Sequence, residues 1–206
     1  MKLAREPRLR PVSIEALHPT QVTVGMREVK AKRKHWRTLG KQAEFLGSHL
    51  IPVIHGYKQR YFVVDHHHLA LALHQEGVQK VAVTVIADLT MLDRDVFWTY
   101  LDNRGWVHPY DDKGRRCSYA EIPRTINGLV DDPYRSLAGE LRRAGGYAKD
   151  TTPFSEFLWA DFLRRQIKRD RVDSNFARAL EQAQELARGA ASSYLPGWCG
   201  TTVPTD

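Results

Sequence analysis

The sequence predicts an α+β fold, in which a small mixed β-sheet with helices precedes an all-helical C-terminal part. Short apolar runs rich in β-branched residues alternate with helical patterns up to about residue 90. Beyond that point the strand signals fade, and apolar residues recur at helical spacing. A chain of 206 residues can hold one core and a smaller appendage, so we expect two domains, residues 1–105 and 106–206.

The expected order of the first part is strand, helix, hairpin, helix and strand. Residues 12–19 alternate in hydrophobicity as a half-buried strand does, and Pro19 ends the pattern. Residues 24–50 place apolar side chains on one helical face and Lys and Arg on the other, which predicts a long basic helix broken at Gly40. Residues 51–64 contain two apolar runs around a glycine, the pattern of a β-hairpin.

A helix and a last strand are expected after the hairpin. The stretch "DHHHLALALHQEG", residues 65–77, changes to helical spacing and ends at Gly77, a residue type common at helix C-termini. Residues 80–89, "KVAVTVIADL", form a nearly continuous apolar run. That run predicts a strand buried on both faces.

Helix signals dominate the second part of the chain. Thr90 and Asp93 have capping-box spacing, and the helix that they open is expected to close at Gly105 before a polar loop. A later helix is expected to have Thr152 as its N-cap and Pro153 as its first residue. Further helical patterns cover residues 134–146, 152–170 and 174–190.

Composition narrows the class of protein. The chain has 31 Lys and Arg against 24 Asp and Glu, a formal charge of +7 that would attract phosphate-bearing partners. Its apolar runs are far shorter than the roughly 18 residues of a membrane helix, and no apolar signal segment follows the basic start. Cys117 and Cys199 lack the spacing of a disulfide framework or a thiolate zinc site. We expect a soluble cytoplasmic protein with no membrane partner.

Several stretches, taken together, resemble a known family. They lie between Ile14 and Ile167 and read "HPTQVTVGMREVKAK", "VVDHHHLALAL", "HPYDDKG", "DDPYRSLAGELRRAGGY" and "FSEFLWADF". In these stretches the chain is similar to a family labelled ParB-like nucleases, within the ParB/sulfiredoxin-like superfamily. The resemblance implies that fold, and it implies nucleoside triphosphate binding at the strand-to-helix turn. Superfamily members include a CTP-hydrolysing DNA clamp, an ATP-dependent sulfinic acid reductase and a free-serine kinase, so the fold does not fix the reaction.

The turn at residues 65–69 departs from the usual superfamily sequence. That turn commonly reads Asp-Gly-His-His-Arg or Gly-Glu-Arg-Arg, whereas here it reads Asp-His-His-His-Leu. His66 replaces a glycine that lets the backbone approach a phosphate, and Leu69 replaces an arginine that can bind phosphate with two hydrogen bonds. Lys30, Lys32 or Arg33 on the preceding basic helix could supply the missing charge.

The turn carries the chemistry that we expect of the protein. A helix N-terminus presents free N–H groups to a phosphate, and the imidazoles of His66, His67 and His68 would add donors. Asp65 is a candidate Mg²⁺ ligand beside a bound nucleoside triphosphate, or a catalytic base. His67 is a candidate acid/base or phosphate ligand. The alternative is that Asp65 only caps its helix.

A transition-metal site is a further alternative. Asp65 with His67, or His66 with His68, would supply half of the ligands. The polar loop after Gly105 would complete the site by folding over the turn. The loop residues that could contribute to either kind of site are His108, Asp111, Asp112 and Lys113.

Other patterns allow both functional and structural interpretations. Gln21 and Glu28 lie where the first strand enters the basic helix, a region that faces the nucleotide in related folds, but a helical Glu is usually only solvated. Trp98, Tyr100 and Trp106 could stack a base, although such aromatics are more often core residues. Basic clusters could contact DNA phosphates or form solvated helix faces.

We therefore predict a nucleotide- or phosphoester-binding protein that transfers a phosphoryl group or hydrolyses a phosphodiester with Mg²⁺. The competing prediction is a non-enzymatic DNA-binding or partner-binding module that has kept the fold and lost the phosphate chemistry.

Overall fold

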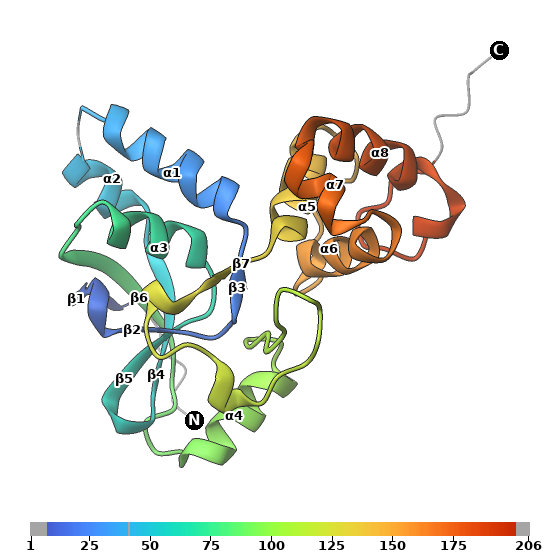
Figure 1. The fold of residues 1–206 in the computed structure, drawn as a ribbon. Coiled ribbons are helices and arrows are strands. Elements are labelled where there is room, and N and C mark those ends of the chain that lie inside the picture. Colours follow the sequence, from blue (N-terminus) through green and yellow to red (C-terminus); the bar gives the residue numbers. More distant parts are fainter. Residues whose placement is uncertain (1–7, 41, 201–206) are drawn as a thin grey trace.

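The computed structural model describes residues 8–40 and 42–200, which form two lobes (Figure 1). The first lobe contains the β-sheet and four helices, and the second contains four further helices. The predicted α+β fold with a helical C-terminal part is therefore confirmed. The basic start of the chain, residues 1–7, lies outside the described part. Within that part, no helix has both the length and the apolar character needed to cross a membrane.

The first lobe is built on a mixed five-stranded sheet. In order across the sheet, the strands are β1 (Arg8–Ser13), β6 (Lys80–Asp88), β4 (Ile51–Gly56), β5 (Arg60–Val63) and β2 (Leu17–Pro19). β4 and β5 form the predicted antiparallel hairpin, and β6 runs antiparallel to β1. The parallel pairs are β4 with β6 and β2 with β5.

The strand expected at residues 12–19 is interrupted. A 3-10 turn at Ile14–Ala16 separates β1 from β2, and these strands lie on opposite edges of the sheet. Ile14 is buried whereas Ala16 is exposed, so the alternation expected of one strand ends inside the turn. Pro19 ends β2 as predicted.

Three helices cover one face of the sheet: α1 (Met26–Thr38), α2 (Gln42–Ser48) and α3 (His67–Gln75). The predicted break of the basic helix at Gly40 is confirmed, because α1 ends before it and α2 begins after it. Val29 and Trp36 of α1 join Leu73 of α3 in the core beneath. The predicted end of α3 is confirmed at Gly77, whose φ of +75° suits glycine.

The other face of the sheet is only partly covered. Ile54 and Phe62 pack there against α4 (Arg94–Asn103). The expectation that β6 is buried on both faces is wrong, because Val81 and Val83 are buried whereas Ile86 is 42% exposed. The physical reason is that α4 covers this face beside β4 and β5 and leaves the end of β6 open.

The N-terminus of α4 differs from the expected capping box. The N-cap is Asp93, whose carboxylate accepts hydrogen bonds from the N–H groups of Asp95 at 3.0 Å and Val96 at 2.9 Å. The Thr90 hydroxyl instead donates to Asp88 at 2.8 Å. The predicted helix therefore forms, but it begins three residues later because the Asp93 carboxylate satisfies its first amides.

The segment 106–131 packs against the first lobe. Ile126 and Leu129 belong to the core around α3. Beyond them, β7 (Val130–Asp131) pairs in parallel with β3 (Thr23–Val24). The packing thus divides the chain near Asp132, later than the expected boundary at residue 105.

The second lobe is a helical unit with its own core around Trp159. The start predicted for its second helix is wrong: the N-cap is Phe154, with a left-handed φ of 59°, rather than Thr152. The Phe154 ring contacts the ring of His108, with 5.0 Å between centroids, and this contact places a turn where the helix was expected to begin. The helices are α5 (Pro133–Arg143), α6 (Ser155–Gln166), α7 (Arg169–Ser174) and α8 (Phe176–Arg188).

Candidate functional site

A cleft of about 1020 Å³ lies between the two lobes. The turn at residues 65–69 forms part of its first-lobe wall, with Gln21 of the preceding segment and Glu28 and Lys32 of α1. Helix α5 and the start of α6 form the opposite wall. The charged second-lobe residues that line it are Arg135, Glu140, Arg142, Arg143, Lys149 and Glu156.

The backbone of the turn is held in a shape that glycine adopts easily. His66 has φ 66° and ψ 25°, the left-handed region, at a cost of about 1–2 kcal/mol for a residue with a Cβ. Two hydrogen bonds hold it there: its Nδ1–H donates to the Leu50 carbonyl at 3.0 Å, and its backbone N–H donates to Asp65 Oδ1 at 2.6 Å. The substitution of histidine for glycine therefore keeps the turn conformation.

The first amides of α3 are free to bind an anion. His66 is the N-cap, and it makes no side-chain capping bond. The Asp65 carboxylate accepts the adjacent His66 N–H, so the alternative in which Asp65 caps the helix is wrong. Among the described residues, no acceptor reaches the backbone N–H groups of His67, His68 or Leu69. These donors and the positive end of the helix dipole face the cleft.

His67 is a neutral donor rather than a cation. It is 3% exposed, and its Nε2 accepts the backbone N–H of Thr20 at 3.2 Å, so the proton of the neutral ring is on Nδ1. Burial, with a smaller effect from the neighbouring His68, lowers the pKa of His67 to about 3. A phosphate bound here would receive an N–H group from His67, without a positive charge.

His68 also stabilises the fold, through contacts with the start of α1. Its Nε2 accepts the backbone N–H of Gly25 at 2.9 Å, and its Nδ1 lies 3.6 Å from Glu28 Oε2. Burial lowers the pKa of His68 well below its usual value, and the positive charge of Arg135 adds to this shift. Together His67 and His68 fasten the segment that leads into α1, a role that sequence reasoning did not identify.

These buried neutral histidines predict an acid-sensitive fold. In the unfolded chain His67 protonates near pH 6.5, whereas its pKa in the folded protein is about 3. The unfolded state binds more protons between these values, so stability is full above pH 6.5 and falls as the pH decreases, by up to about 1.4 kcal/mol per pH unit for one histidine. Urea unfolding at about pH 7.5 and about pH 5 measures this loss.

The matched control for this prediction is on the same helix. His67→Gln should reduce the pH dependence, because glutamine can still accept the Thr20 N–H but does not titrate. His74→Gln should keep the wild-type dependence. An unchanged slope in His67→Gln would contradict the assignment.

Arg135 is the unexpected member of the site. It is 6% exposed, and its Nε and one Nη have no hydrogen-bond partner within residues 8–40 and 42–200. Its guanidinium carbon lies 3.6 Å from the centre of the Phe157 ring, and its other Nη is 3.4 Å from Glu156 Oε2. Buried polar groups are nearly always paired, so these two donors make Arg135 the side chain of this wall best suited to pair with an anion. Helix α5 thus places an arginine in the cleft that the turn, with Leu69 in place of an arginine, also lines.

Further cations surround the turn, from both lobes. Lys32 lies 3.4 Å from Glu28, and Arg143 is held by Glu140 at 2.8 Å. Lys149 also lines the cleft, and the described part of the chain offers it no ionic partner. Lys30 does not line the cleft and is exposed, so of the two lysines predicted to replace the missing charge only Lys32 is placed to do so.

The loop residues predicted to contribute do not line the cleft. His108 lies behind Phe157, with 3.7 Å between ring centroids, and burial followed by the charge of Arg135 lowers its pKa to about 3. The Asp111 carboxylate accepts the N–H groups of Lys113 and Arg115, and thereby shapes a turn. Lys113 is exposed.

The transition-metal alternative is wrong for the residues that the structure describes. They contain no group of three or more His, Cys, Asp or Glu side chains that could hold a metal ion. Mg²⁺ needs fewer protein ligands, because water and phosphate oxygens complete its shell. Asp65 is exposed beside the free amides, and its second oxygen has no partner among the described residues, which fits that kind of ligand.

Comparison with known proteins identifies the family. A family model described as "Putative ParB-like nuclease" matches residues 10–165. The chain belongs to this family. It is also similar to the crystal structure of protein Atu1540 from Agrobacterium tumefaciens, with 49% identity, a TM-score of 0.91 and coverage of 96% of this chain and 100% of that chain. No curated protein matches the chain significantly.

The region matched by the ParB-like nuclease family contains both walls of the cleft. It begins in β1 and ends at Arg165 in α6, so it includes the turn at residues 65–69 and also Arg135. Sequence reasoning found the turn, Gln21, Glu28 and Lys32, but it missed Arg135. No periodic pattern pointed to Arg135, because it lies beside the apolar stripe of α5 rather than within it and is nevertheless buried.

Proposed function

We propose that the cleft of this ParB-like nuclease family member binds the phosphate group of a nucleotide or a nucleic acid. The observation that carries the proposal is Arg135, a buried cation with two unpaired donors on the wall opposite the free amides of α3. Anion binding would pair those donors and would use the helix N-terminus at the same time. The family relationship supports a phosphodiester as the ligand class.

Two walls made by different lobes suit a ligand larger than inorganic phosphate. The cleft of about 1020 Å³ is at the upper end of the range for ligand sites, and Trp106 and Phe157 add aromatic surface to its lining. Lys149 and Arg143 on the second lobe could contact further phosphates. A nucleoside triphosphate or a short stretch of DNA would fill such a space.

Hydrolysis is the reaction that the residues support best. A water molecule would attack phosphorus, Asp65 would accept its proton, and the P–O bond to the leaving group would break, with the leaving oxygen taking a proton from solvent water. The α3 amides and Arg135 would stabilise negative charge on the non-bridging oxygens. In the alternative role Asp65 would hold Mg²⁺, which would supply further charge neutralisation, and the attacking water would then lose its proton to solvent. With a pKa of about 3, His67 is not a proton donor near pH 7 and acts in this proposal as a phosphate ligand.

The alternative of a non-enzymatic DNA-binding module uses the same cleft without Asp65 chemistry. The formal charge of +7 and the cations of both lobes favour contact with DNA phosphates. A cytoplasmic location fits either version. Asp65→Asn separates them, because it should abolish hydrolysis with Mg²⁺ and leave DNA binding in place if hydrolysis is the function.

A ligand panel tests the proposed function directly. ATP, CTP, GTP and ADP, each with and without Mg²⁺, and a short duplex DNA are titrated while the melting temperature is recorded, because binding to the folded state raises it. Lys149→Ala should weaken the best ligand roughly two- to fivefold, the effect of one exposed charge. Lys80→Ala, an exposed lysine outside the cleft, should change nothing.

The panel has a clear negative outcome. If neither nucleotide nor DNA raises the melting temperature, phosphate-ester binding is ruled out as the function of the cleft. Equal weakening by Lys149→Ala and Lys80→Ala would show attraction to the overall positive charge rather than binding in the cleft.

A further inference from the structure

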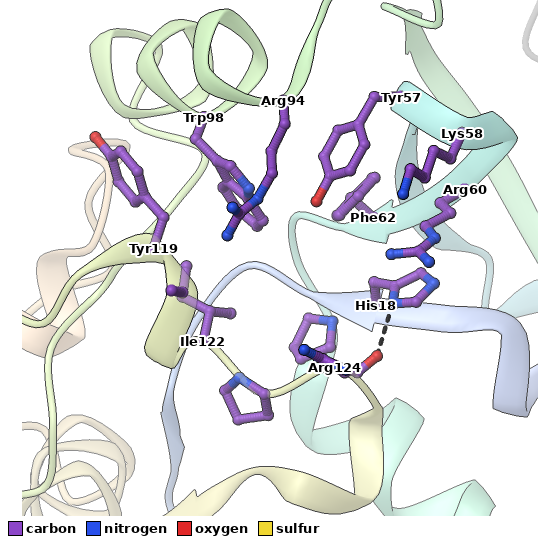
Figure 2. A pocket seen from close by; sticks show the side chains of 13 residues that line it. His18, Tyr57, Lys58, Arg60, Phe62, Arg94, Trp98, Tyr119, Ile122 and Arg124 are labelled. Carbon is purple, nitrogen blue, oxygen red and sulfur yellow. Dashed lines mark hydrogen bonds between the residues drawn. The ribbon is translucent and has the colours of Figure 1, made fainter.

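A second cavity, of about 500 Å³, lies in the first lobe and shares no lining residue with the cleft (Figure 2). Strand β2 with its neighbour β5 forms one side, and the start of α4 and the segment 119–124 form the others. We call it the basic aromatic pocket. Its charged and aromatic lining residues, apart from His18, are Tyr57, Lys58, Arg60, Phe62, Arg94, Trp98, Tyr119 and Arg124.

The charged side chains that line the pocket are all positive among the described residues. Lys58, Arg60, Arg94 and Arg124 line it, and among the described residues no Asp or Glu does. None of these four side chains has a hydrogen bond or an ion pair with another described residue. Figure 2 shows the Arg94 and Arg60 guanidinium groups and the Lys58 ammonium group around the same opening. Four unpaired cations around one hollow repel one another, and an anion bound between them would relieve that repulsion.

Aromatic rings form the walls beside these cations. Trp98 and Tyr119 are stacked, with 5.7 Å between centroids and 14° between planes, and Tyr57 lies 5.2 Å from Phe62. Tyr57 and Tyr119 are only partly buried, so ring surface is open to a ligand. A flat aromatic group could stack there while its anionic part contacts the cations.

His18 fixes one wall of the pocket. Its Nδ1–H donates to the Arg124 carbonyl at 2.6 Å, which ties the segment 119–124 to β2. Burial lowers the pKa of His18, so the ring stays neutral near pH 7 and adds no charge to the four cations. With Nδ1 protonated, Nε2 is left as an acceptor, a group suited to an amino or imino N–H of a base.

We propose that the basic aromatic pocket binds one nucleotide unit, with its phosphate on the cations and its base against the aromatic wall. A cavity of about 500 Å³ is within the range of small-ligand sites. Free mononucleotides and the 5′ end of a single strand share this chemistry, phosphate beside a stacking base. This site does not depend on the proposed function of the cleft.

The test is a titration followed by nuclear magnetic resonance of the full ¹⁵N-labelled chain. Adenosine 5′-monophosphate should shift the Trp98 indole signal and the amides of β5 and of residues 119–124. Ribose 5-phosphate should bind about fivefold or more weakly, because it lacks the stacking base. Tighter binding of a 5′-phosphorylated single-stranded trinucleotide than of the mononucleotide would identify a strand end as the source of the unit, and equal binding would identify the free nucleotide.

Matched double variants separate the pocket from general charge attraction. Arg60→Gln with Arg124→Gln removes two exposed pocket cations and should weaken the mononucleotide about tenfold or more. Lys80→Gln with Arg188→Gln removes the same charge elsewhere and should have no effect. Equal weakening by both double variants, or equal binding of ribose 5-phosphate and the mononucleotide, would overturn the proposal.

One further variant distinguishes this site from the cleft. Arg135→Met lies outside the pocket and should leave the shifts of Trp98 and residues 119–124 intact. Loss of those shifts in Arg135→Met would assign the binding to the cleft and overturn the second site.

Discussion

Arg135→Met is expected to abolish phosphate-ester binding in the cleft and to leave the free protein at least as stable as the wild type. Losing a buried guanidinium that pairs with a phosphate costs roughly 2–5 kcal/mol of binding free energy. Without a ligand the same guanidinium lowers the stability of the folded protein, because two of its nitrogen atoms are buried and have no hydrogen-bond partner among the described residues. Glu156 keeps Arg142 as its partner at 2.5 Å. Calorimetric titration and urea unfolding of the same samples measure both effects.

Two companion variants make this result specific. Arg135→Lys keeps the charge but loses the planar fork, so its affinity should lie between those of the wild type and Arg135→Met. Arg188→Met removes an exposed arginine from α8 and should change neither affinity nor stability. Marked destabilisation of Arg135→Met would show that Arg135 serves the fold through Glu156, and it would remove the main support for the proposed function.

Arg164→Met is expected to have the opposite effect on stability. Arg164 Nη2 lies 2.5 Å from Asp132 Oδ2, and Asp132 is 1% exposed at the junction of the lobes. Asp132 also caps α5 through the N–H of Tyr134 at 2.9 Å, and burial raises the pKa of its carboxyl. Removing the arginine leaves a buried carboxylate without its cation, which typically costs roughly 3–5 kcal/mol. Urea unfolding measures the loss.

The adjacent residue supplies the control. Arg165→Met removes an exposed side chain whose one ionic partner in the described part of the chain is Asp161, so its cost should be below about 1 kcal/mol. Adding Asp132→Asn to Arg164→Met should restore part of the stability, because the amide keeps the cap and needs no cation. Equal costs for Arg164→Met and Arg165→Met would show that the buried ion pair does not hold the junction.

Most secondary structure could be predicted because it depends on local spacing. The helix at residues 67–75 and the hairpin before it follow from changes in hydrophobic period. The starts of two helices were predicted wrongly because a single side chain, rather than the hydrophobic pattern, sets where each helix begins. Asp93 satisfies the first amides of α4 and sets its start, and the Phe154 ring contacts His108 and delays α6. β6 was assigned a second buried face because its sequence does not show how far α4 extends over the sheet.

The residues that line the cleft were predicted in part. The turn itself was found, because strand, polar turn and apolar helix are continuous in the chain. The structural roles of His67 and His68 were not predicted. These histidines accept hydrogen bonds from the backbone N–H groups of Thr20 and Gly25, which are far away in the sequence. Lys30 and Lys32 looked equivalent by composition, and only Lys32 lines the cleft.

The sequence by itself determined that this protein has an α+β lobe with a strand-turn-helix segment at residues 60–75, followed by a helical lobe. Those features rest on interactions between residues close in the chain. Only the tertiary structure decided which charges face that segment. Arg135 reaches the cleft because β7 pairs with β3 and brings the start of α5 against the first lobe. Burial in that position, which no local pattern encodes, leaves the Nε and one Nη of its guanidinium without a hydrogen-bond partner among the described residues, while the other Nη pairs with Glu156.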